Sequence, residues 1–326
     1  MSIILVTGIG GFVGSYLAEK TLDEGHKVYG FIKPGSQLGN IEHIRGSINV
    51  IECDVTDEEK CSSWIMQIRP DFIYHFAAVA KTFEVFPREV YETNFIGTAA
   101  ILEAVKKSGV RTRVMIPTSS EMYGAVSPQD LPLREDAPFR PLHPYAVSKV
   151  SVHYLIQYYT ATMDLDIVEL RPFNQIGPRQ SLGFVVPDFA SQLAEIKLGR
   201  REPVLQVGDL AVQRDFLDVR DAVEAYVRLA EAGRPGEAYH VCSGTAVSVE
   251  RILQMLIEIA GVDVKVVSAP WKVRSHLVPK VVGSFDKIQV LTGWRPRRSL
   301  AETLSDTFAY WIDILRHRES NGAVTW

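Results

Sequence analysis

The first part of the chain alternates short runs of apolar side chains with longer segments in which apolar positions recur at helical spacing. The apolar runs predict strands at residues 2–7, 27–32, 48–53, 71–76 and 113–117. The periodic segments predict helices at about residues 13–22, 58–68 and 90–107. Strands that are apolar throughout are typical of a parallel sheet with helices on both faces. The pattern therefore predicts an α/β fold built on a doubly wound parallel sheet.

The same pattern continues, with an interruption, into the second half of the chain. We expect a helix at about residues 144–163, a buried strand at 166–170, a helix at 221–230 and a strand at 238–242. In between, residues from about 171 to 214 are rich in turn formers and carry one predicted helix. We therefore predict one domain of residues 1–170 with about 215–243, and a smaller, discontinuous C-terminal domain of about 171–214 with 244–326. A ligand is expected in the cleft between them.

Composition narrows the class of protein. The 326 residues are 46% apolar and 23% charged, which is typical of a globular chain and not of a disordered or fibrous one. A net charge of −4 without a concentrated basic surface argues against a nucleic-acid partner. The three cysteines form no CxxC pair, so we expect no bound metal and a reducing compartment. No signal peptide or membrane-length apolar run is present, and we expect a cytoplasmic protein without a membrane partner.

Three glycines, Gly8, Gly11 and Gly14, lie directly between the first predicted strand and the first predicted helix. This G-x-x-G-x-x-G spacing permits a tight turn and lets a pyrophosphate approach the amides at the helix N-terminus, where the helix dipole favours negative charge. Three glycines alone are a weak motif. Their position after a strand, before a helix and at the start of the sheet predicts a dinucleotide cofactor.

The second strand bears on which dinucleotide is bound. An acidic residue at its end would bind the ribose 2′-hydroxyl of NAD, but this chain has Lys33 there, which would pair with the 2′-phosphate of NADP. A solvated lysine at a strand end is the alternative. Asp54, after the third strand, is placed to accept a hydrogen bond from the adenine amino group, and capping of its own loop is the competing interpretation.

Tyr145 and Lys149 are four residues apart on a predicted helix and therefore share one face. A lysine ammonium beside a tyrosine hydroxyl stabilises the phenolate, so we expect a lowered Tyr145 pKa and an acid/base active near neutral pH. A second pair with the same spacing, Tyr16 and Lys20, follows the glycine loop on the phosphate side, and we assign it no catalytic role.

The segment after the strand at 113–117 reads Thr-Ser-Ser-Glu-Met-Tyr-Gly and contains Ser119, Ser120 and Glu121. The carboxyl ends of parallel strands face the ligand crevice, so these hydroxyls and this carboxylate are expected to meet the substrate. A polar loop without function is the alternative for such a segment taken alone. Its occurrence between a glycine loop and a Tyr-x-x-x-Lys pair favours an active site.

The segments TGIGGFVG, TSSEMYG, PYAVSK, RPFNQIGPRQ and RDFLDVRDAVEAY occur in this order. Together they resemble the extended short-chain dehydrogenase/reductase family acting on nucleotide sugars, over essentially the whole chain. The resemblance implies a Rossmann-type domain and NADP(H), with NAD(H) as the other cofactor to consider. Within the family, FNQIGPRQSLGFVVPDFASQL and YHVCSG resemble the reductases that form GDP-rhamnose from GDP-4-keto-6-deoxymannose, and the GDP-mannose 4,6-dehydratases are close relatives.

The resemblance implies roles for individual positions. Tyr145 would be the acid/base, Ser119 would hydrogen-bond the sugar C4 oxygen, and Lys149 would hold the nicotinamide ribose. Further cofactor or supporting contacts would come from Phe12, Val13, Val55, Ala77, Ala78 and Asn94. Substrate contacts would come from Ser120, Asn174, Arg179, Arg214 and Arg274. In the last two, the guanidinium groups would clamp the nucleotide diphosphate.

Several positions depart from the dehydratase pattern. Dehydratases similar to this chain carry paired arginines where it has Lys33 and Pro34, and an RRG segment where it has residues 177–180. A carboxylate expected near the nucleotide ribose is replaced by Leu277. Glu121, in contrast, favours a dehydratase, because dehydration needs a base for the C5 proton. Reductases resembling this chain also carry this glutamate.

These observations leave three hypotheses open. The first is an NADPH-dependent reductase of GDP-4-keto-6-deoxymannose, and the second is a 4,6-dehydratase or 4-epimerase that consumes no cofactor. The third is a non-catalytic NADP-binding regulator, against which the Ser119, Tyr145 and Lys149 set argues. A serine hydrolase is excluded because G-x-S-x-G is absent. The resemblance also implies a homodimer or homotetramer formed through helices, in which residues 145–159 would take part unless that helix packs only in the core.

Overall fold

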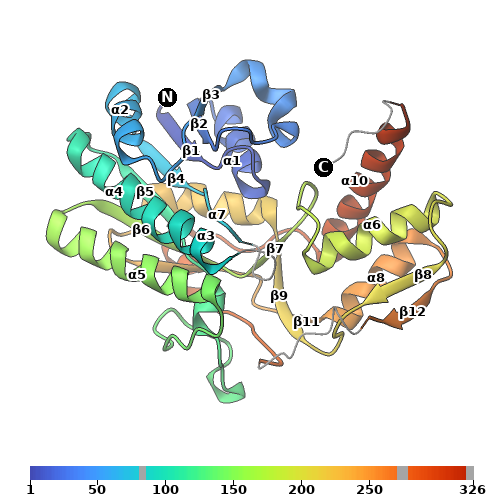
Figure 1. The fold of residues 1–326 in the computed structure, drawn as a ribbon. Coiled ribbons are helices and arrows are strands. Elements are labelled where there is room, and N and C mark those ends of the chain that lie inside the picture. The colour runs from blue at the N-terminus through green and yellow to red at the C-terminus, as the bar shows by residue number, and fades with distance from the viewer. Residues whose placement is uncertain (81–85, 270–277, 321–326) are drawn as a thin grey trace.

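A seven-stranded sheet forms the centre of the computed structural model, which describes residues 1–80, 86–269 and 278–320 (Figure 1). Its strand order is β10-β6-β5-β4-β1-β2-β3, and every neighbouring pair is parallel. The strands are β1 (Ile3–Thr7), β2 (Lys27–Ile32), β3 (Asn49–Glu52), β4 (Phe72–His75), β5 (Arg113–Pro117), β6 (Asp166–Pro172) and β10 (Ala238–Val241). The chain order reverses between β1 and β4, which is where such sheets bind ligands.

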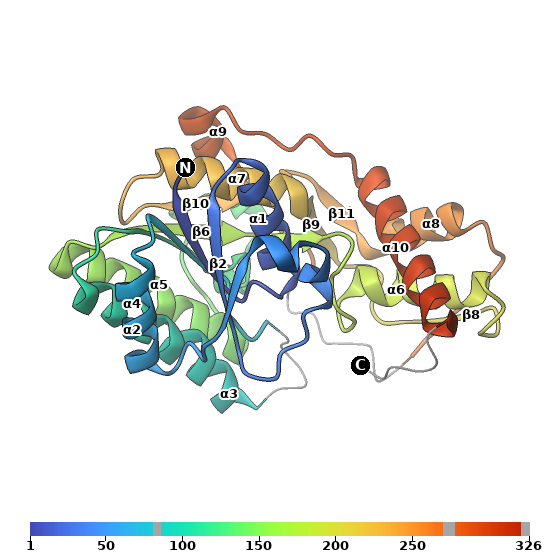
Figure 2. The same cartoon turned by 90° about the horizontal axis from the view of Figure 1, so that it is seen from above.

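Helices cover both faces of this sheet, as Figure 2 shows from above. One face carries α1 (Phe12–Asp23), α7 (Val219–Ala232) and α9 (Asp286–Thr292). The other carries α2 (Glu58–Ile68), α4 (Gly97–Ser108) and α5 (Pro144–Met163). Buried side chains from strands and helices form one apolar core on each side. This arrangement confirms the predicted α/β, Rossmann-type fold.

The segment before the fifth strand is less regular than predicted. In place of one helix over residues 90–107, the chain forms α3 (Pro87–Tyr91), a single π-helical turn (Glu92–Ile96) and then α4. A π turn inserts one extra residue into the helical path and is often found at functional sites. Here it contains Asn94, whose side chain is buried.

A further apolar core lies in the part of the chain that the sequence marks as different in character. It is built on a three-stranded sheet of β7 (Asn174–Ile176), β9 (Gln213–Asp218) and β11 (Ala246–Ser248), and a two-stranded sheet of β8 (Val204–Val207) and β12 (Lys265–Ser268). Around them pack α6 (Val185–Lys197), α8 (Val249–Ala260) and α10 (Leu300–Ser320).

Two residues of the predicted smaller domain pack with the large sheet. Ile288 of α9 and Trp294 belong to the core beneath the large sheet, although both lie in the stretch expected to form the smaller domain. The remaining short elements are the 3-10 turns Gly39–Ser47, Ser120–Tyr123 and Pro128–Asp130. Within the described residues, every helix is too short or too polar to cross a lipid bilayer.

Candidate active site

The glycine loop has the geometry that a dinucleotide needs. Gly8 has φ +71°, and a Cβ there would lie 2.8 Å from the backbone nitrogen of Ala77, so only glycine fits without strain. A Cβ on Gly14 would overlap the carbonyl oxygen of Gly8. Gly11 is the N-cap of α1 and makes no capping bond through a side chain, so the first amides of the helix stay available for a phosphate. Phe12 and Val13 are half-buried in the first turn of α1.

A buried chain of hydrogen bonds holds this loop against the end of β4. Thr98 donates its hydroxyl proton to the Asn94 carbonyl (2.6 Å), so it accepts from His75 Nε2 (3.1 Å). His75 Nδ1 then accepts from the Thr7 hydroxyl (2.8 Å), which itself accepts from the backbone nitrogen of Ala77 (3.1 Å). Burial lowers the pKa of His75 to about 3, which agrees with a neutral ring. Sequence reasoning identified Ala77 and Ala78 but missed Thr7, His75 and Thr98.

Asn94 supports the site from the π turn. Its side-chain oxygen accepts from Val79 N (2.8 Å), and its nitrogen donates to Val79 O (3.1 Å) and to Ser148 Oγ (3.0 Å). Ser148 in turn donates to the Tyr145 carbonyl (2.7 Å). Asn94 therefore connects the loop after β4 to α5. Of the two roles expected for Asn94, cofactor contact or support of the site, these contacts agree with support.

The predicted adenosine-side residues gather at the ends of β2 and β3. Lys33 is exposed beyond β2, and Val55 is buried against Gly97. Asp54 Oδ1 accepts from the backbone and the hydroxyl of Thr56 (3.0 and 2.8 Å), so it does cap its own loop. Burial acts to raise the pKa of Asp54, but the Thr56 hydrogen bonds and the charge of Lys33 hold it below the ordinary value. A carboxylate that remains ionised here can still accept from an adenine amino group.

Ser119, Tyr145 and Lys149 come together beyond the end of β5. The Ser119 side chain hydrogen-bonds Tyr145 and also accepts from Glu121 N (3.2 Å) at the start of the 3-10 turn Ser120–Tyr123. Lys149, one turn after Tyr145 on α5, donates to the Pro117 carbonyl (2.9 Å). Its Nζ lies 5.8 Å from the Tyr145 ring centre. Ser120 is buried beside Ser119.

The expected lowering of the Tyr145 pKa is wrong for the protein alone. Burial disfavours the phenolate and raises the pKa of Tyr145 to about 12, against the opposing effect of the Ser119 hydrogen bond. Burial also lowers the pKa of Lys149 to about 8. The Lys149 ammonium is turned to the Pro117 carbonyl and does not offset the desolvation of the phenol. Tyr145 is therefore held protonated.

Glu121 is partnered by a residue that sequence reasoning missed. His143 is the N-cap of α5: its Nδ1 accepts from Ala146 N (3.2 Å), so the ring proton is on Nε2, which donates to Glu121 Oε2 (3.1 Å). The His143 and Tyr145 rings stack with centres 6.1 Å apart. Its position immediately before Pro144 is an N-cap signal that the sequence offered.

The predicted substrate residues have different outcomes. Asn174 Nδ2 donates to the Asp215 carbonyl (3.1 Å), and Arg214 Nη1 donates to the Gln213 carbonyl (2.9 Å). Burial lowers the pKa of Arg214, while the negative charge of Glu121 acts in the opposite direction. Arg214 and Glu121 therefore interact across the site. Arg274 lies outside the described residues.

Arg179 does not lie with the other predicted substrate residues. Its Nη1 pairs with Glu19 (2.7 Å) and its guanidinium lies 4.5 Å from the centre of the Tyr16 ring, both on α1. The backbone of Arg179 is left-handed, with φ +71°. Tyr16 also donates to the Pro178 carbonyl (3.2 Å). The expected contact of Arg179 with the substrate stays a prediction: in this structure, the turn after β7 carries its side chain back to α1.

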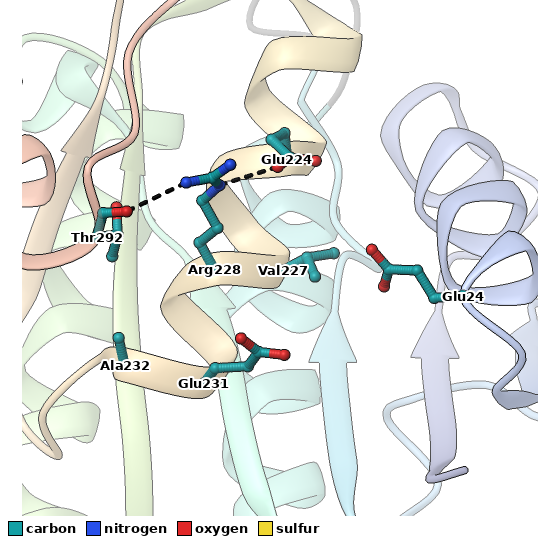
Figure 3. Close-up of a pocket in the computed structure, with 7 residues that line it drawn as sticks. All are labelled: Glu24, Glu224, Val227, Arg228, Glu231, Ala232 and Thr292. Carbon is teal, nitrogen blue, oxygen red and sulfur yellow. Dashed lines mark hydrogen bonds and ion pairs between the residues drawn. The ribbon is translucent and has the colours of Figure 1, made fainter.

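Two hollows lie away from Ser119, Tyr145 and Lys149. One of about 590 Å³ is lined by Arg179, Glu19 and His43 between α1 and the turn Gly39–Ser47. The other, of about 340 Å³, is lined by Glu24, Glu224 and Arg228 among its seven residues, and Figure 3 shows Arg228 joined to Glu224 and Thr292. Glu24 caps the end of α1 remote from the glycine loop, so this hollow is separate from the candidate active site.

Comparison with known proteins agrees with this geometry. The family model described as GDP-mannose 4,6 dehydratase matches residues 5–307. The chain is 31% identical over 315 residues to a GDP-6-deoxy-D-mannose reductase of Pseudomonas aeruginosa, covering 96% of this chain and 98% of the relative. A solved structure of RMD from Pseudomonas aeruginosa complexed with NADPH has a TM-score of 0.84 at 30% identity, covering 96% and 100%.

A more distant activity is also represented among the similar structures. UDP-glucose 4-epimerase from Thermotoga maritima, solved with UDP-glucose, has a TM-score of 0.86 at 28% identity, covering 96% of this chain and 99% of the other. The fold is thus shared by reductases and epimerases. The match to the family model spans nearly the whole chain, and the chain belongs to the GDP-mannose 4,6-dehydratase family of extended short-chain dehydrogenases/reductases.

Proposed function

We propose that the protein is an NADPH-dependent reductase that converts the C4 ketone of GDP-4-keto-6-deoxymannose to the alcohol of GDP-rhamnose. The observation that carries the proposal is the placement of Tyr145, Ser119 and Lys149 together at the carboxyl edge of the sheet, in a chain similar over nearly its whole length to a GDP-6-deoxy-D-mannose reductase. Reduction of a ketone requires an acid at the oxygen, and a protonated phenol is that acid. The NADPH complex of a similar protein supports the same cofactor here.

The chain's own residues account for the proton and for the orientation of the substrate. Bound NADPH supplies the hydride that adds to C4. The Tyr145 hydroxyl donates its proton to the C4 oxygen as negative charge develops there, and the Ser119 hydroxyl stabilises the same oxygen by a hydrogen bond. Lys149, anchored on the Pro117 carbonyl, would hold the nicotinamide ribose. Arg214 adds positive charge on the substrate side.

The cofactor preference rests on Lys33 and the glycine loop. Lys33 is exposed at the end of β2, where its ammonium would pair with a 2′-phosphate. The amides at the N-terminus of α1, which no side chain caps, would hold the pyrophosphate. NAD(H) would use the same loop but would leave Lys33 without its phosphate partner.

Glu121 favours a second candidate, a GDP-mannose 4,6-dehydratase or a 4-epimerase. Its side chain is 44% exposed toward the site, hydrogen-bonds His143 and interacts with Arg214. A carboxylate in this place is able to remove a proton from C5 of a 4-keto sugar. In either reaction, the cofactor is oxidised and reduced within one turnover, so its net concentration does not change.

The net consumption of NADPH distinguishes the reductase from the dehydratase and the epimerase. We expect stoichiometric loss of NADPH absorbance when purified protein is given GDP-4-keto-6-deoxymannose, with GDP-rhamnose as the product. The matched reaction contains GDP-mannose and NADP. Formation of a 4-keto-6-deoxy sugar there, without NADPH loss in the first reaction, would identify a dehydratase, whereas no change in either would point to epimerisation or another nucleotide.

We also propose that the protein is a homodimer through α3 and α5. These helices pack against each other and lie side by side in Figure 1. The outward face of α5 exposes Val147, Tyr154 and Tyr158, while Val152 and Ile156 of the same helix are buried in the core. Tyr91 and Ile96 extend the exposed apolar face from α3 and the π turn. The helix therefore packs in the core and still presents an apolar surface to a second copy.

Substitution of this face tests the dimer. We expect wild type to have twice the 36.4 kDa mass of one chain in light scattering, and Tyr154→Glu to shift it toward the monomer. Val290→Glu is the control, because Val290 is 88% exposed on α9, outside this face. A wild-type tetramer that Tyr154→Glu reduces to dimers also agrees with the proposal. A mass unchanged by Tyr154→Glu would show that another surface mediates assembly.

A further inference from the structure

An ionised network lies beneath the candidate active site, centred on Glu169 of β6. The Glu169 side chain has no solvent exposure, and each of its oxygens accepts two hydrogen bonds. Oε1 accepts from the Thr118 hydroxyl and from Arg171 Nε, both at 2.7 Å. Oε2 accepts from His153 Nδ1 (2.7 Å) and from Arg171 Nη2 (3.2 Å).

The two partners of Glu169 other than Arg171 belong to the two elements that carry the candidate catalytic groups. Thr118 immediately precedes Ser119 in the segment 118–124, which we call the catalytic loop. His153 lies on α5, one helical turn after Lys149 and two turns after Tyr145. One carboxylate therefore holds the catalytic loop with one oxygen and the catalytic helix with the other.

The same network also fixes the far end of the catalytic loop. Arg171 Nη1 donates to the Tyr123 hydroxyl (2.9 Å), so that hydroxyl donates its own proton to His240 Nε2 (2.6 Å). The His240 Nδ1 proton goes to the Ser284 carbonyl (3.2 Å). Tyr123 is the last residue of the 3-10 turn that begins beside Ser119. Both ends of the loop are thus attached to the Glu169–Arg171 pair.

Stability alone does not explain such an arrangement. The attraction within a buried ion pair often does little more than offset the free energy of desolvating its two charges. Replacing the pair with apolar side chains of similar size often leaves a protein equally stable. A fully satisfied polar network does fix one geometry, because moving any member leaves a buried donor or acceptor without its partner. The separation of Ser119 and Tyr145 depends on how the loop lies against the helix, and these are the two elements that the network joins.

We infer that Glu169 is a positioning residue: it fixes the catalytic loop against the catalytic helix so that the Ser119 and Tyr145 hydroxyls meet one substrate oxygen. The inference rests on the proposed function only because turnover provides the assay. It does not depend on which reaction the protein catalyses. It predicts that loosening the contact of Glu169 with Thr118 or with His153 slows the chemical step more than it weakens binding. The reason is that misplacement of the hydroxyls by a fraction of an ångström slows a reaction that depends on orientation.

The test uses substitutions that leave the buried ion pair in place. Thr118→Val removes the loop contact, His153→Phe removes the helix contact, and Thr118→Ser retains the hydroxyl. Thr112→Val is the matched control: Thr112 is also buried just before β5, but its hydroxyl has no hydrogen-bond partner in the structure. All are compared in kcat, KM, NADPH affinity and thermal midpoint, on whichever turnover the wild type shows.

We expect Thr118→Val and His153→Phe each to lower kcat about tenfold with KM and NADPH affinity nearly unchanged. Thr118→Ser should return to within about threefold of wild type, and Thr112→Val should leave kcat unchanged. The inference is overturned if Thr118→Val behaves like Thr112→Val, or if kcat, NADPH affinity and the thermal midpoint all fall together while KM rises. A wild type that turns over without net NADPH loss would instead reject the proposed reductase and leave this comparison intact.

Discussion

Tyr145→Phe is expected to lower the rate of NADPH oxidation by about 10²–10⁴-fold and to leave NADPH affinity close to wild type. The substitution removes only the hydroxyl, which is the acid of the proposed reduction and the partner of Ser119. The hydride acceptor would then have to take its proton from water, without a positioned donor. Stopped-flow absorbance for turnover and fluorescence titration for NADPH binding measure the two quantities separately.

The matched control is Tyr16→Phe. Tyr16 is also four residues before a lysine, but its hydroxyl donates to the Pro178 carbonyl, and Lys20 pairs with Glu24 and Glu224. We expect Tyr16→Phe to retain most of the turnover, because this pair has no part in the proton transfer. Comparable losses in both variants would reject Tyr145 as the specific acid.

Arg171→Met is expected to destabilise the protein by about 3–5 kcal/mol, the largest loss of stability that we predict for a single substitution. Arg171 is 2% exposed, and its removal leaves the buried Glu169 carboxylate with only its contacts to Thr118 and His153. The Tyr123 hydroxyl and the Glu135 carbonyl also lose a donor. Urea unfolding followed by circular dichroism measures the change.

Two further variants show whether buried charge is the cause. Arg134→Met breaks the ion pair with Asp286, whose partners are both mostly exposed, and should change stability little. Glu169→Gln in the Arg171→Met background replaces the unpaired carboxylate with a neutral amide and should recover part of the loss. If the double variant is less stable than Arg171→Met, the desolvated charge is not responsible.

The large sheet was predictable because its strands are apolar throughout and are separated by helices of regular period. Segments 2–7, 27–32 and 113–117 correspond closely to β1, β2 and β5. The π turn within 90–107 was not predictable, since its apolar spacing reads as one continuous helix. The extra residue is stabilised by tertiary contacts of Asn94 with Val79 and Ser148, far along the chain.

At the candidate site, sequence spacing was sufficient for Tyr145 and Lys149 because a helix puts them on one face. The pKa of Tyr145 was not predictable, because it depends on burial by segments distant in sequence. The contacts of Arg179 were not predictable for a related reason: its left-handed backbone turns the chain back toward α1. Glu169 and His153 carried no motif of their own, and only the packing of α5 on β6 brings them together.

The strand order also has a consequence for the synthesis of the chain. The glycine loop and the strands β1–β4 are complete within the first 80 residues, whereas His240, which holds the Tyr123 end of the catalytic loop, arrives on the edge strand β10. The glycine loop is therefore synthesised early, and the last attachment of the catalytic loop is synthesised late. Because α7 and β10 also complete the core and the edge of the large sheet, nearly the whole domain must be synthesised before the catalytic loop is held in place.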